Sequence, residues 1–177
     1  MRIYTRKGDD GTTGLLHGGR VAKNSPLPTA YGTVDEAQAA LGVARAEAGD
    51  EELGEVLVRL ERDLWVLMAE LATNPERSAD LIPGETRVTP EMVTALEELI
   101  DGWSERFEPP TEFVVPGETR ASAALDVART VVRRAERAAL AADLAESQVV
   151  PYLNRLSDLV WTLARWEEGR SLTARPR

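Results

Sequence analysis

The most distinctive stretch of the chain is a polar segment near its N-terminus that could cradle phosphate groups, Thr5-Arg6-Lys7-Gly8-Asp9-Asp10-Gly11-Thr12-Thr13-Gly14. Glycine lets backbone N–H groups approach a phosphate closely, and threonine hydroxyls donate hydrogen bonds to it. Asp9 or Asp10 could hold Mg²⁺ beside the phosphates, and counter-charge is available from Arg6, Lys7, Arg20 and Lys23. The pattern is not a P-loop, because no Gly-Lys-Thr/Ser precedes a helix. Composition alone leaves a mobile, glycine-rich arm equally open.

A second candidate cluster is a row of arginines near residue 130. Arg129, Arg133 and Arg137 are four residues apart, so a helix would place them on one face. With Arg134 and the single acid Glu136, the four arginines leave a local charge of +3 in a chain whose net charge is −9. The planar guanidinium suits phosphate and carboxylate groups. The row therefore indicates an anion-binding face, with a solvated, salt-bridged face as the alternative.

Two further features are less specific when they are considered alone. In the segment Tyr152-Leu153-Asn154-Arg155-Leu156-Ser157-Asp158, the side chains of Asn154 and Asp158 would share one face of a helix, because they are four residues apart. The polar flank of a core helix explains this segment at least as well. Asp35 would lie one turn into the first helix, where an acidic residue is unremarkable.

The elements that must position these residues are predicted to be helices. Thr33 followed by Glu36 fits a capping box and predicts a first helix from residue 33 to about 48. Leucines at alternating steps of four and three predict a second helix over about 51–73, with an inward seam of Leu53, Leu57, Leu60, Leu64, Leu67 and Leu71. Thr89-Pro90 is typical of a helix start. The third helix would then bury Met92, Leu96, Leu99, Trp103 and Phe107.

The remaining helices complete an all-α, five-helix bundle in a single domain over residues 1–177. The fourth is predicted from about residue 120 to 144 and the fifth from about 151 to 168, after a loop over 74–88 and a short strand-like segment, Phe113-Val114-Val115-Pro116-Gly117. Within this domain we expect an irregular nucleotide-binding segment over residues 1–30, the helical bundle over 33–170 and a frayed tail over 171–177.

Composition excludes several classes of function. The chain has 177 residues with 43% apolar side chains, so a real core is expected, and 21 basic against 30 acidic residues argue against nucleic-acid binding. It has no cysteine, which excludes disulfides and thiolate metal sites. The only histidine, His17, makes a zinc site improbable and is expected to be a loop residue. No membrane span or leader is visible, so we expect a soluble, cytoplasmic protein.

Six segments, in order along the chain, resemble the PduO-type ATP:cob(I)alamin adenosyltransferases. They run from residue 3 to residue 158, so the resemblance covers most of the chain and its motifs are specific. They are Ile3-Tyr4-Thr5-Arg6-Lys7-Gly8-Asp9-Asp10-Gly11-Thr12-Thr13, Gly19-Arg20-Val21-Ala22-Lys23, Ala30-Tyr31-Gly32-Thr33-Val34-Asp35-Glu36, Phe113-Val114-Val115-Pro116-Gly117, Ala128-Arg129-Thr130 through Arg137, and Tyr152 through Asp158.

The resemblance implies a homotrimeric five-helix bundle with active sites between subunits. It implies transfer of the 5′-deoxyadenosyl group of ATP to cob(I)alamin, giving adenosylcobalamin and inorganic triphosphate. Arg133 would act in catalysis, Phe113 would lie under the corrin ring, and Asp35 would pair with Arg129 across the subunit interface. By the same resemblance, ATP would be contacted by Thr5, Arg6, Lys7, Gly8, Thr13, Gly14, Lys23, Arg133, Arg134, Ala135, Glu136, Arg137 and Asn154.

The resemblance also implies a metal ion and two partner enzymes for the reaction. Mg²⁺ would be held through the phosphates of ATP, a cob(II)alamin reductase would supply the reduced corrinoid, and an adenosylcobalamin-dependent mutase could receive the product. Neither nucleic acid nor a membrane is an expected partner.

Two positions depart from the family pattern. Glu118 stands where a second glycine usually follows Pro-Gly, and Asp126 stands where a histidine usually precedes Ala-Arg-Thr. Both are expected on the corrin side of the site, so they bear on cobalamin handling more than on ATP binding. They favour the first alternative function, a non-catalytic trimer that binds nucleotide or delivers a finished cofactor. A structural bundle with a disordered arm is the second alternative.

Overall fold

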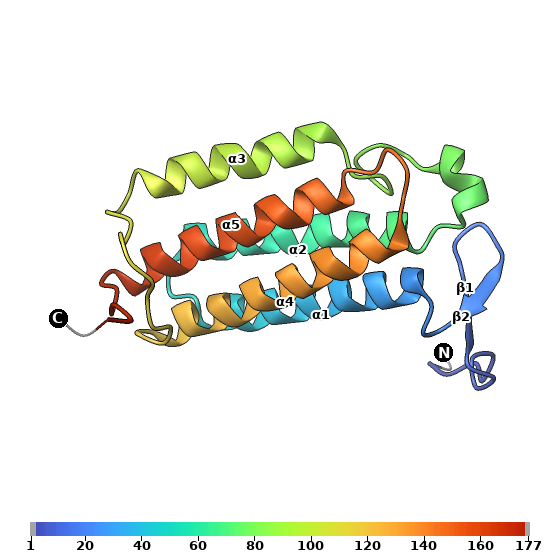
Figure 1. Ribbon diagram of the computed structural model, residues 1–177, viewed down its shortest axis with the longest axis horizontal. Coiled ribbons are helices and arrows are strands. Elements are labelled where there is room, and N and C mark those ends of the chain that lie inside the picture. The colour runs from blue at the N-terminus through green and yellow to red at the C-terminus, as the bar shows by residue number, and fades with distance from the viewer. Residues whose placement is uncertain (1–2, 176–177) are drawn as a thin grey trace.

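The chain folds into an elongated bundle of five α-helices, described for residues 3–175 by a computed structural model (Figure 1). The helices are α1 (Pro26–Glu47), α2 (Glu51–Leu71), α3 (Pro90–Ser104), α4 (Arg120–Ala142) and α5 (Val149–Glu168). α1 packs against α2 and α4, α4 packs against α5, and α3 lies along the outer side of α5. The predicted all-α, five-helix bundle is therefore confirmed.

The leucine seam of α2 is at the centre of the core. All six leucines that the spacing placed inward, from Leu53 to Leu71, are fully buried. Each contributes about 1.5–3 kcal/mol through removal of its side chain from water. Asp50 caps the helix, because its carboxylate accepts the backbone N–H of Leu53 at 2.8 Å. The seam fixes the register of α2 against α1, and so fixes the bundle that carries the site.

The third helix buries less than its pattern predicted. Leu96 and Trp103 are buried, but Met92 and Leu99 are only partly buried. Phe107 lies beyond the end of α3 at Ser104 and is half-buried. The ring of Trp103 meets Trp166 of α5 edge-on at 4.5 Å, and Arg106 lies over the ring of Trp103, 4.2 Å from its centroid. α3 is thus an outer helix that contacts α5 through this tryptophan pair.

The predicted start of the first helix at Thr33 is wrong. α1 begins at Pro26 after Ser25, and Thr33 lies inside it, where its hydroxyl donates to the carbonyl oxygen of Thr29 at 2.7 Å. Proline is tolerated in a first turn, since its missing N–H would have no partner there anyway. Pro26 and Pro28 therefore begin the helix instead of delaying it. The irregular N-terminal segment ends near residue 25, not 30.

That N-terminal segment contains a small β-hairpin. β1 (Thr12–Gly14) pairs antiparallel with β2 (Arg20–Ala22), with Thr13 opposite Val21. The N–H of Leu16 donates to the carbonyl oxygen of Ala72 at 2.8 Å, and the N–H of Asn74 donates to that of Leu16 at 3.0 Å, which attaches the hairpin to the chain leaving α2. A 3₁₀ helix, η1 (Pro75–Asp80), then interrupts the predicted loop over 74–88. The hairpin lies beyond the start of α1 at one end of the bundle (Figure 1).

The predicted frayed tail is wrong for residues 171–175. Val114 and Thr173 form an antiparallel bridge. The N–H of Val115 donates to the carbonyl oxygen of Leu172 at 2.8 Å, and the N–H of Ala174 donates to that of Phe113 at 2.7 Å. Residues 176–177 lie outside the described range. The strand-like character predicted for the Phe113 segment is therefore real, and its partner is the C-terminal segment.

A membrane-spanning helix is not found in the part of the chain that the structure describes. None of its helices combines the length and the apolar character that crossing a bilayer requires.

Candidate active site

The N-terminal loop is held in shape by one arginine, Arg20. Its Nη2 donates to the carbonyl oxygen of Lys7 at 2.6 Å and to the hydroxyl of Thr12, also at 2.6 Å, while Nε donates to the same hydroxyl at 3.0 Å. Asp10 completes the turn by accepting the N–H of Thr12 at 2.9 Å. Arg20, expected as phosphate counter-charge, is thus occupied in shaping the loop.

The conformation of the loop brings a lysine over a glycine. A Cβ atom on Gly8 would lie 3.0 Å from Nζ of Lys23 and 3.1 Å from the carbonyl oxygen of Thr12, so the ammonium group of Lys23 lies close to the Gly8 backbone. The backbone N–H of Lys23 is fixed to the carbonyl oxygen of Gly11 at 2.9 Å, and Gly11 has φ +81°, which favours glycine. Gly8 and Lys23 therefore place a cationic group beside a glycine turn, an arrangement that suits a phosphate chain.

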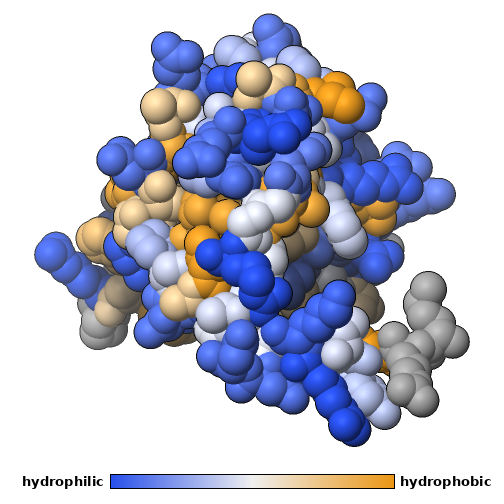
Figure 2. Space-filling model, turned by 90° about the vertical axis from the view of Figure 1, so that its right-hand side faces the viewer, coloured by the Kyte–Doolittle hydropathy of each residue, from blue (hydrophilic) through white to orange (hydrophobic). Residues whose placement is uncertain are grey.

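The other predicted contact residues of this segment are exposed or belong to the hairpin. Thr5, Arg6 and Lys7 are exposed, and the hydroxyl of Thr5 accepts the N–H of Lys7 at 3.4 Å. Thr13 and Gly14 belong to β1. His17 lies exposed in the connection between the two strands with φ 62°, as expected of a loop residue. The end of the bundle that carries this hairpin is largely hydrophilic (Figure 2).

The two aspartates of the loop could bind Mg²⁺ only together with phosphate oxygens. The N–H and hydroxyl of Thr12 lower the pKa of Asp10, so its carboxylate is held charged, but Oδ1 is already engaged by both groups. Among residues 3–175 no cluster of three or more acidic or histidine side chains could hold a metal alone. Asp9 and Asp10 could supply the one or two carboxylates that Mg²⁺ takes beside phosphate oxygens.

Three members of the predicted arginine row are exposed on α4, Arg133, Arg134 and Arg137, whereas Arg129 is half-buried beside Asp126. Arg134 pairs with Glu36 of α1. Glu136 accepts Nδ2 of Asn154 at 3.1 Å, so the Tyr152–Asp158 segment of α5 adjoins the row. Nη1 of Arg137 donates to the carbonyl oxygen of Arg133 at 2.8 Å, and the guanidinium of Arg133 makes no hydrogen bond within residues 3–175.

One predicted contact residue faces the wrong way. Ala135 is fully buried in the core with Val132 and Ala139. It lies on the inward stripe of α4, so its side chain cannot reach a ligand at the arginine face. Ala135 therefore uses its side chain for packing, and its predicted contact with ATP stays a prediction.

Phe113 stands at the mouth of a hollow at the opposite end of the bundle. Its side chain is 92% exposed, which is unusual for phenylalanine and marks it as a surface available to a partner or ligand. The hollow has a volume of about 420 Å³, and Val114, Trp161, Asp126, Arg129 and Arg165 also line it. A flat apolar ring beside a mixed polar wall suits a large, partly apolar ligand.

The polar wall of this hollow is a buried ionic cluster. Oδ2 of Asp126 accepts Nη2 of Arg165 at 2.5 Å, and Oδ1 accepts Nε of Arg129 at 3.2 Å. Nη2 of Arg165 also lies 3.1 Å from Oε2 of Glu168. The departure at Asp126 thus brings no uncompensated charge, because buried Arg165 faces it. Glu118, the other departure, is exposed and outside the cluster.

One chain does not bring all the predicted residues together. Within the described residues, no hydrogen bond or ion pair joins the N-terminal loop to the arginine row or to Asn154. The hairpin and the Phe113 segment lie at opposite ends of the bundle (Figure 1). Asp35 is exposed on α1 and makes no ion pair with any residue from 3 to 175, Arg129 included.

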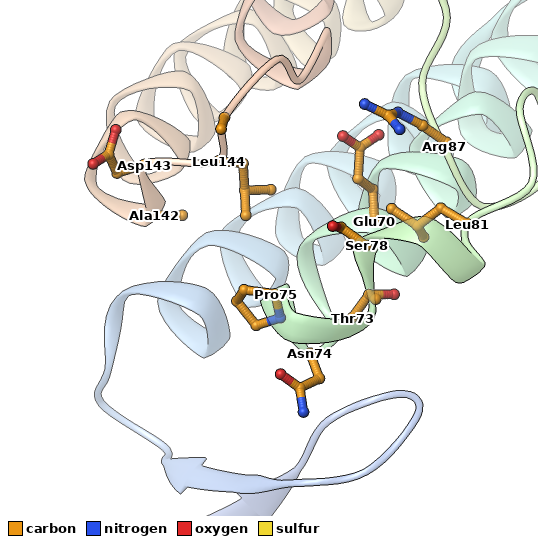
Figure 3. Close-up of a pocket in the computed structure, with 11 residues that line it drawn as sticks. Glu70, Thr73, Asn74, Pro75, Ser78, Leu81, Arg87, Ala142, Asp143 and Leu144 are labelled. Atoms are coloured by element: carbon orange, nitrogen blue, oxygen red, sulfur yellow. The ribbon is translucent and has the colours of Figure 1, made fainter.

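A second hollow, of about 230 Å³, lies between η1 and the turn from α4 to α5 (Figure 3). Its one buried carboxylate, Glu70, is fully engaged. Oε2 accepts the N–H of Val88 at 2.6 Å and Oε1 accepts the hydroxyl of Ser147 at 2.6 Å. Asn74 points from this region toward the hairpin. We interpret the hollow as a structural junction that seats the hairpin.

Sequence reasoning missed the structural roles of two arginines. Arg20, expected only as counter-charge, shapes the loop from a position opposite Gly14 in a short hairpin that the sequence does not reveal. Arg165 is buried in α5 with 2% exposure and balances Asp126. An arginine among Leu163, Ala164 and Trp166 could have been noticed, because a charged residue on an apolar stretch of helix requires a buried partner.

These features define a class: an all-α bundle with a glycine-rich loop carrying Lys23 at one end and an aromatic-lined hollow at the other. The sequence matches the family described as cobalamin adenosyltransferase over residues 3–167. The chain belongs to this family.

Curated relatives agree with this assignment. The chain is 43% identical over 170 residues to a corrinoid adenosyltransferase of Citrobacter freundii, with 94% of this chain and 95% of the relative covered. It is 42% identical to a corrinoid adenosyltransferase of Mycobacterium tuberculosis, with 98% and 96% covered. It is also 42% identical to corrinoid adenosyltransferase PduO of Salmonella typhimurium, covering 96% of this chain but spanning only 50% of that longer protein.

Solved structures show the same fold. A variant of the PduO-type ATP:corrinoid adenosyltransferase from Lactobacillus reuteri, complexed with cobalamin and ATP, superposes with a TM-score of 0.87 at 30% identity, covering 98% of this chain and 97% of that chain. A further variant of the L. reuteri enzyme, complexed with ATP, gives a TM-score of 0.84.

Proposed function

We propose that the chain transfers the 5′-deoxyadenosyl group of ATP to cob(I)alamin, giving adenosylcobalamin and inorganic triphosphate. Membership of the cobalamin adenosyltransferase family over residues 3–167 is the observation that carries this proposal. The cationic loop around Lys23, the arginine row of α4 and the exposed ring of Phe113 supply the three parts that the reaction needs.

The phosphate-binding residues would act on the leaving group. Cobalt attacks C5′ of ATP, the C5′–O bond breaks, and its electron pair goes to the departing triphosphate. Triphosphate carries about four negative charges, so it leaves readily only if cations already surround it. Arg133, Arg137 and Lys23 would provide them, with Arg134, Glu136 and Asn154 fixing the geometry of the row. No general base is needed, because no proton moves in the displacement.

The loop would orient ATP for in-line attack. Thr5, Gly8 and Thr13 offer hydroxyl and backbone donors, and Arg6, Lys7 and Gly14 flank them. When Mg²⁺ is bound, it would neutralise phosphate charge, with Asp9 and Asp10 as the residues able to hold it.

Phe113 would keep the lower face of the corrin free of an axial ligand. Co(II) resists reduction to Co(I) while water or the nucleotide tail is coordinated to it. An exposed aromatic ring beneath the macrocycle excludes both, because water gains no hydrogen bond there. A Phe113→Ala enzyme should therefore lose the four-coordinate Co(II) signal in electron paramagnetic resonance, and a Phe113→Ala enzyme that keeps this signal would refute the role.

We also propose a homotrimer in which each site lies between two subunits. The placement of the loop and the hollow at opposite ends of one chain supports this arrangement, since the transfer would require the ATP bound by the loop and the corrin bound at Phe113 to meet. Asp35 would then meet Arg129 of a neighbouring subunit. A cytoplasmic location with a cob(II)alamin reductase, and an adenosylcobalamin-dependent mutase as recipient, completes the proposal.

The test is direct adenosylation. The protein is incubated with ATP, Mg²⁺ and chemically reduced cobalamin, and Co–C bond formation is followed by the spectral change from cob(I)alamin. Triphosphate is quantified in parallel. Binding of ATP and cobalamin without turnover would reject the enzyme and support the non-catalytic binding trimer. Failure of ATP to protect residues 1–25 from protease would instead support a structural bundle with an unstructured arm.

A further inference from the structure

Asp126 bonds two arginines at once. Its side chain is 6% exposed and sits on the inner side of α4. One oxygen accepts Nη2 of Arg165 and the other accepts Nε of Arg129, so the carboxylate bridges the core and the wall of the Phe113 hollow. Two bonds from opposite sides fix the plane of the carboxylate.

The bond to Arg165 anchors that carboxylate. The side chain of Arg165 is 1% exposed, and a buried guanidinium is tolerated only with a nearby counter-charge. Glu168 supplies a second carboxylate, but neither its Oε2 nor Nε of Arg165 has a hydrogen-bond partner within residues 3–175. The directed bond of the cluster is therefore the one between Arg165 and Asp126.

The bond to the anchored carboxylate leaves most of the Arg129 guanidinium unpaired within residues 3–175. Only its Nε is used, and among the described residues its two terminal nitrogens have no hydrogen bond or ion pair. Its side chain is 28% exposed at the wall of the hollow, beside Phe113. A guanidinium held by Nε presents its outer edge, the edge that pairs with a carboxylate through two parallel bonds.

We propose that Asp126, held by Arg165, is a positioning residue that aims the outer edge of Arg129 at Asp35 of a second copy of this chain. The inference rests on the proposed trimeric enzyme and adds to it a chain-specific anchor in place of the histidine usual at this position. Through Arg129 the same carboxylate links the subunit contact to the wall of the Phe113 hollow.

Single substitutions at Asp126 would remove the hydrogen-bonded partner of buried Arg165, leaving it only Glu168, and would confuse positioning with folding. Two double variants are therefore compared: each removes Arg165 and leaves Glu168 without its ion pair, so this cost is common to both. Asp126→Leu/Arg165→Met removes both charges and the acceptor for Arg129. Asp126→Asn/Arg165→Gln also removes both charges but keeps an amide oxygen that can accept Nε–H of Arg129. The two variants differ chiefly in whether residue 126 keeps an oxygen that can accept Nε–H of Arg129.

The first readout does not need turnover. The Nε–H of a hydrogen-bonded arginine exchanges slowly and gives a distinct ¹H–¹⁵N resonance. We expect the Arg129 Nε–H resonance, assigned by its loss in Arg129→Lys, to persist in wild type and the amide pair and to disappear in the apolar pair. Persistence in the apolar pair would overturn the proposal.

The second readout is the coupling to Asp35. We expect the apolar pair to lose at least about tenfold in kcat/KM and the amide pair to recover most of that loss. Asp35→Ala should lower kcat/KM in wild type and in the amide pair, and should add little to the apolar pair, since coupled residues are not additive. Full additivity in the apolar pair would overturn the proposal. Wild-type protein without adenosylation activity would instead refute the proposed function, and the resonance test would still report whether Asp126 holds Arg129.

Discussion

Arg133 is exposed on α4 and makes no side-chain hydrogen bond or ion pair within residues 3–175, so its guanidinium is available to a leaving phosphate. We expect Arg133→Ala to lose at least about a hundredfold in kcat, on the scale of about 2.7–4 kcal/mol for a donor that acts in the transition state. Turnover is measured by Co–C bond formation at saturating ATP. Arg62→Ala on the exposed side of α2 is the matched control. Near-normal turnover of Arg133→Ala would show that the row is a structural face.

Asp63 gives a residue-scale prediction about pH. Burial between α2 and α5 raises the pKa of its carboxyl above the usual 3.8, although the hydroxyl of Tyr152 donates to it at 2.8 Å and opposes the shift. The folded chain therefore binds this proton more tightly than the unfolded chain. The contribution of Asp63 to stability is present below the usual pKa and is lost as pH rises through the raised folded value.

Asp63→Asn keeps an acceptor for Tyr152 but cannot ionise. We expect this variant to be at least as stable as wild type to urea at pH 7, with its advantage shrinking as pH falls toward about 4. Urea midpoints across this range measure the difference. A variant clearly less stable at pH 7 would mean that the charged carboxylate stabilises the fold. Tyr152→Phe controls for the hydrogen bond itself.

At the scale of elements, periodicity predicted the helices that bury one side. It missed the features that depend on individual hydrogen bonds or ion pairs. The α2 seam and the α4 face follow from spacing alone, because burial of one helix side is a repeated signal. The start of α1 was misplaced, since Thr33 to Glu36 imitates a cap inside a helix. The hairpin and the strand at Phe113 are three or fewer residues long, too short for any period to reveal. Arg20 and Arg165 act through individual partners that the sequence does not display.

The C-terminal segment that pairs with the Phe113 segment gives a prediction at the scale of elements. The N–H of Ala174 donates to the carbonyl oxygen of Phe113, so Ala174→Pro removes one of the two backbone bonds that flank the ring. A lost bond of about 0.5–1.5 kcal/mol should weaken the fixed placement of Phe113 and lower kcat/KM for cobalamin by about 2- to 12-fold. Thr173→Ala, which keeps the backbone bonds, is the control. Equal activity of all three proteins would show that the strand does not position Phe113.

At the scale of the whole molecule, we ask whether one chain or two neighbouring chains supply the residues of an active site. The loop that holds Lys23 and the row that holds Arg133 make no bonds to each other within residues 3–175. In the proposed ring of three identical subunits, each heterologous interface would combine the loop of one subunit with the row of its neighbour. The sequence predicts both parts, but only the fold shows that they make no bonds to each other within residues 3–175.

Mixed oligomers of two inactive chains test this arrangement. When Lys23→Ala and Arg133→Ala chains are coexpressed in equal amounts with different tags, a wild-type loop meets a wild-type row at about one quarter of interfaces, because each is drawn with a chance of about one half. We expect the whole mixture to show about a quarter of wild-type kcat, and the doubly tagged trimers, in which one interface of three is intact, to show about a third. If loop and row served the same active site within one chain, every site would carry one lesion and the mixture would be no more active than its components. Coexpressing wild type with a Lys23→Ala/Arg133→Ala chain adds an independent check, since inter-subunit sites would give about a quarter of full activity and intra-chain sites about a half.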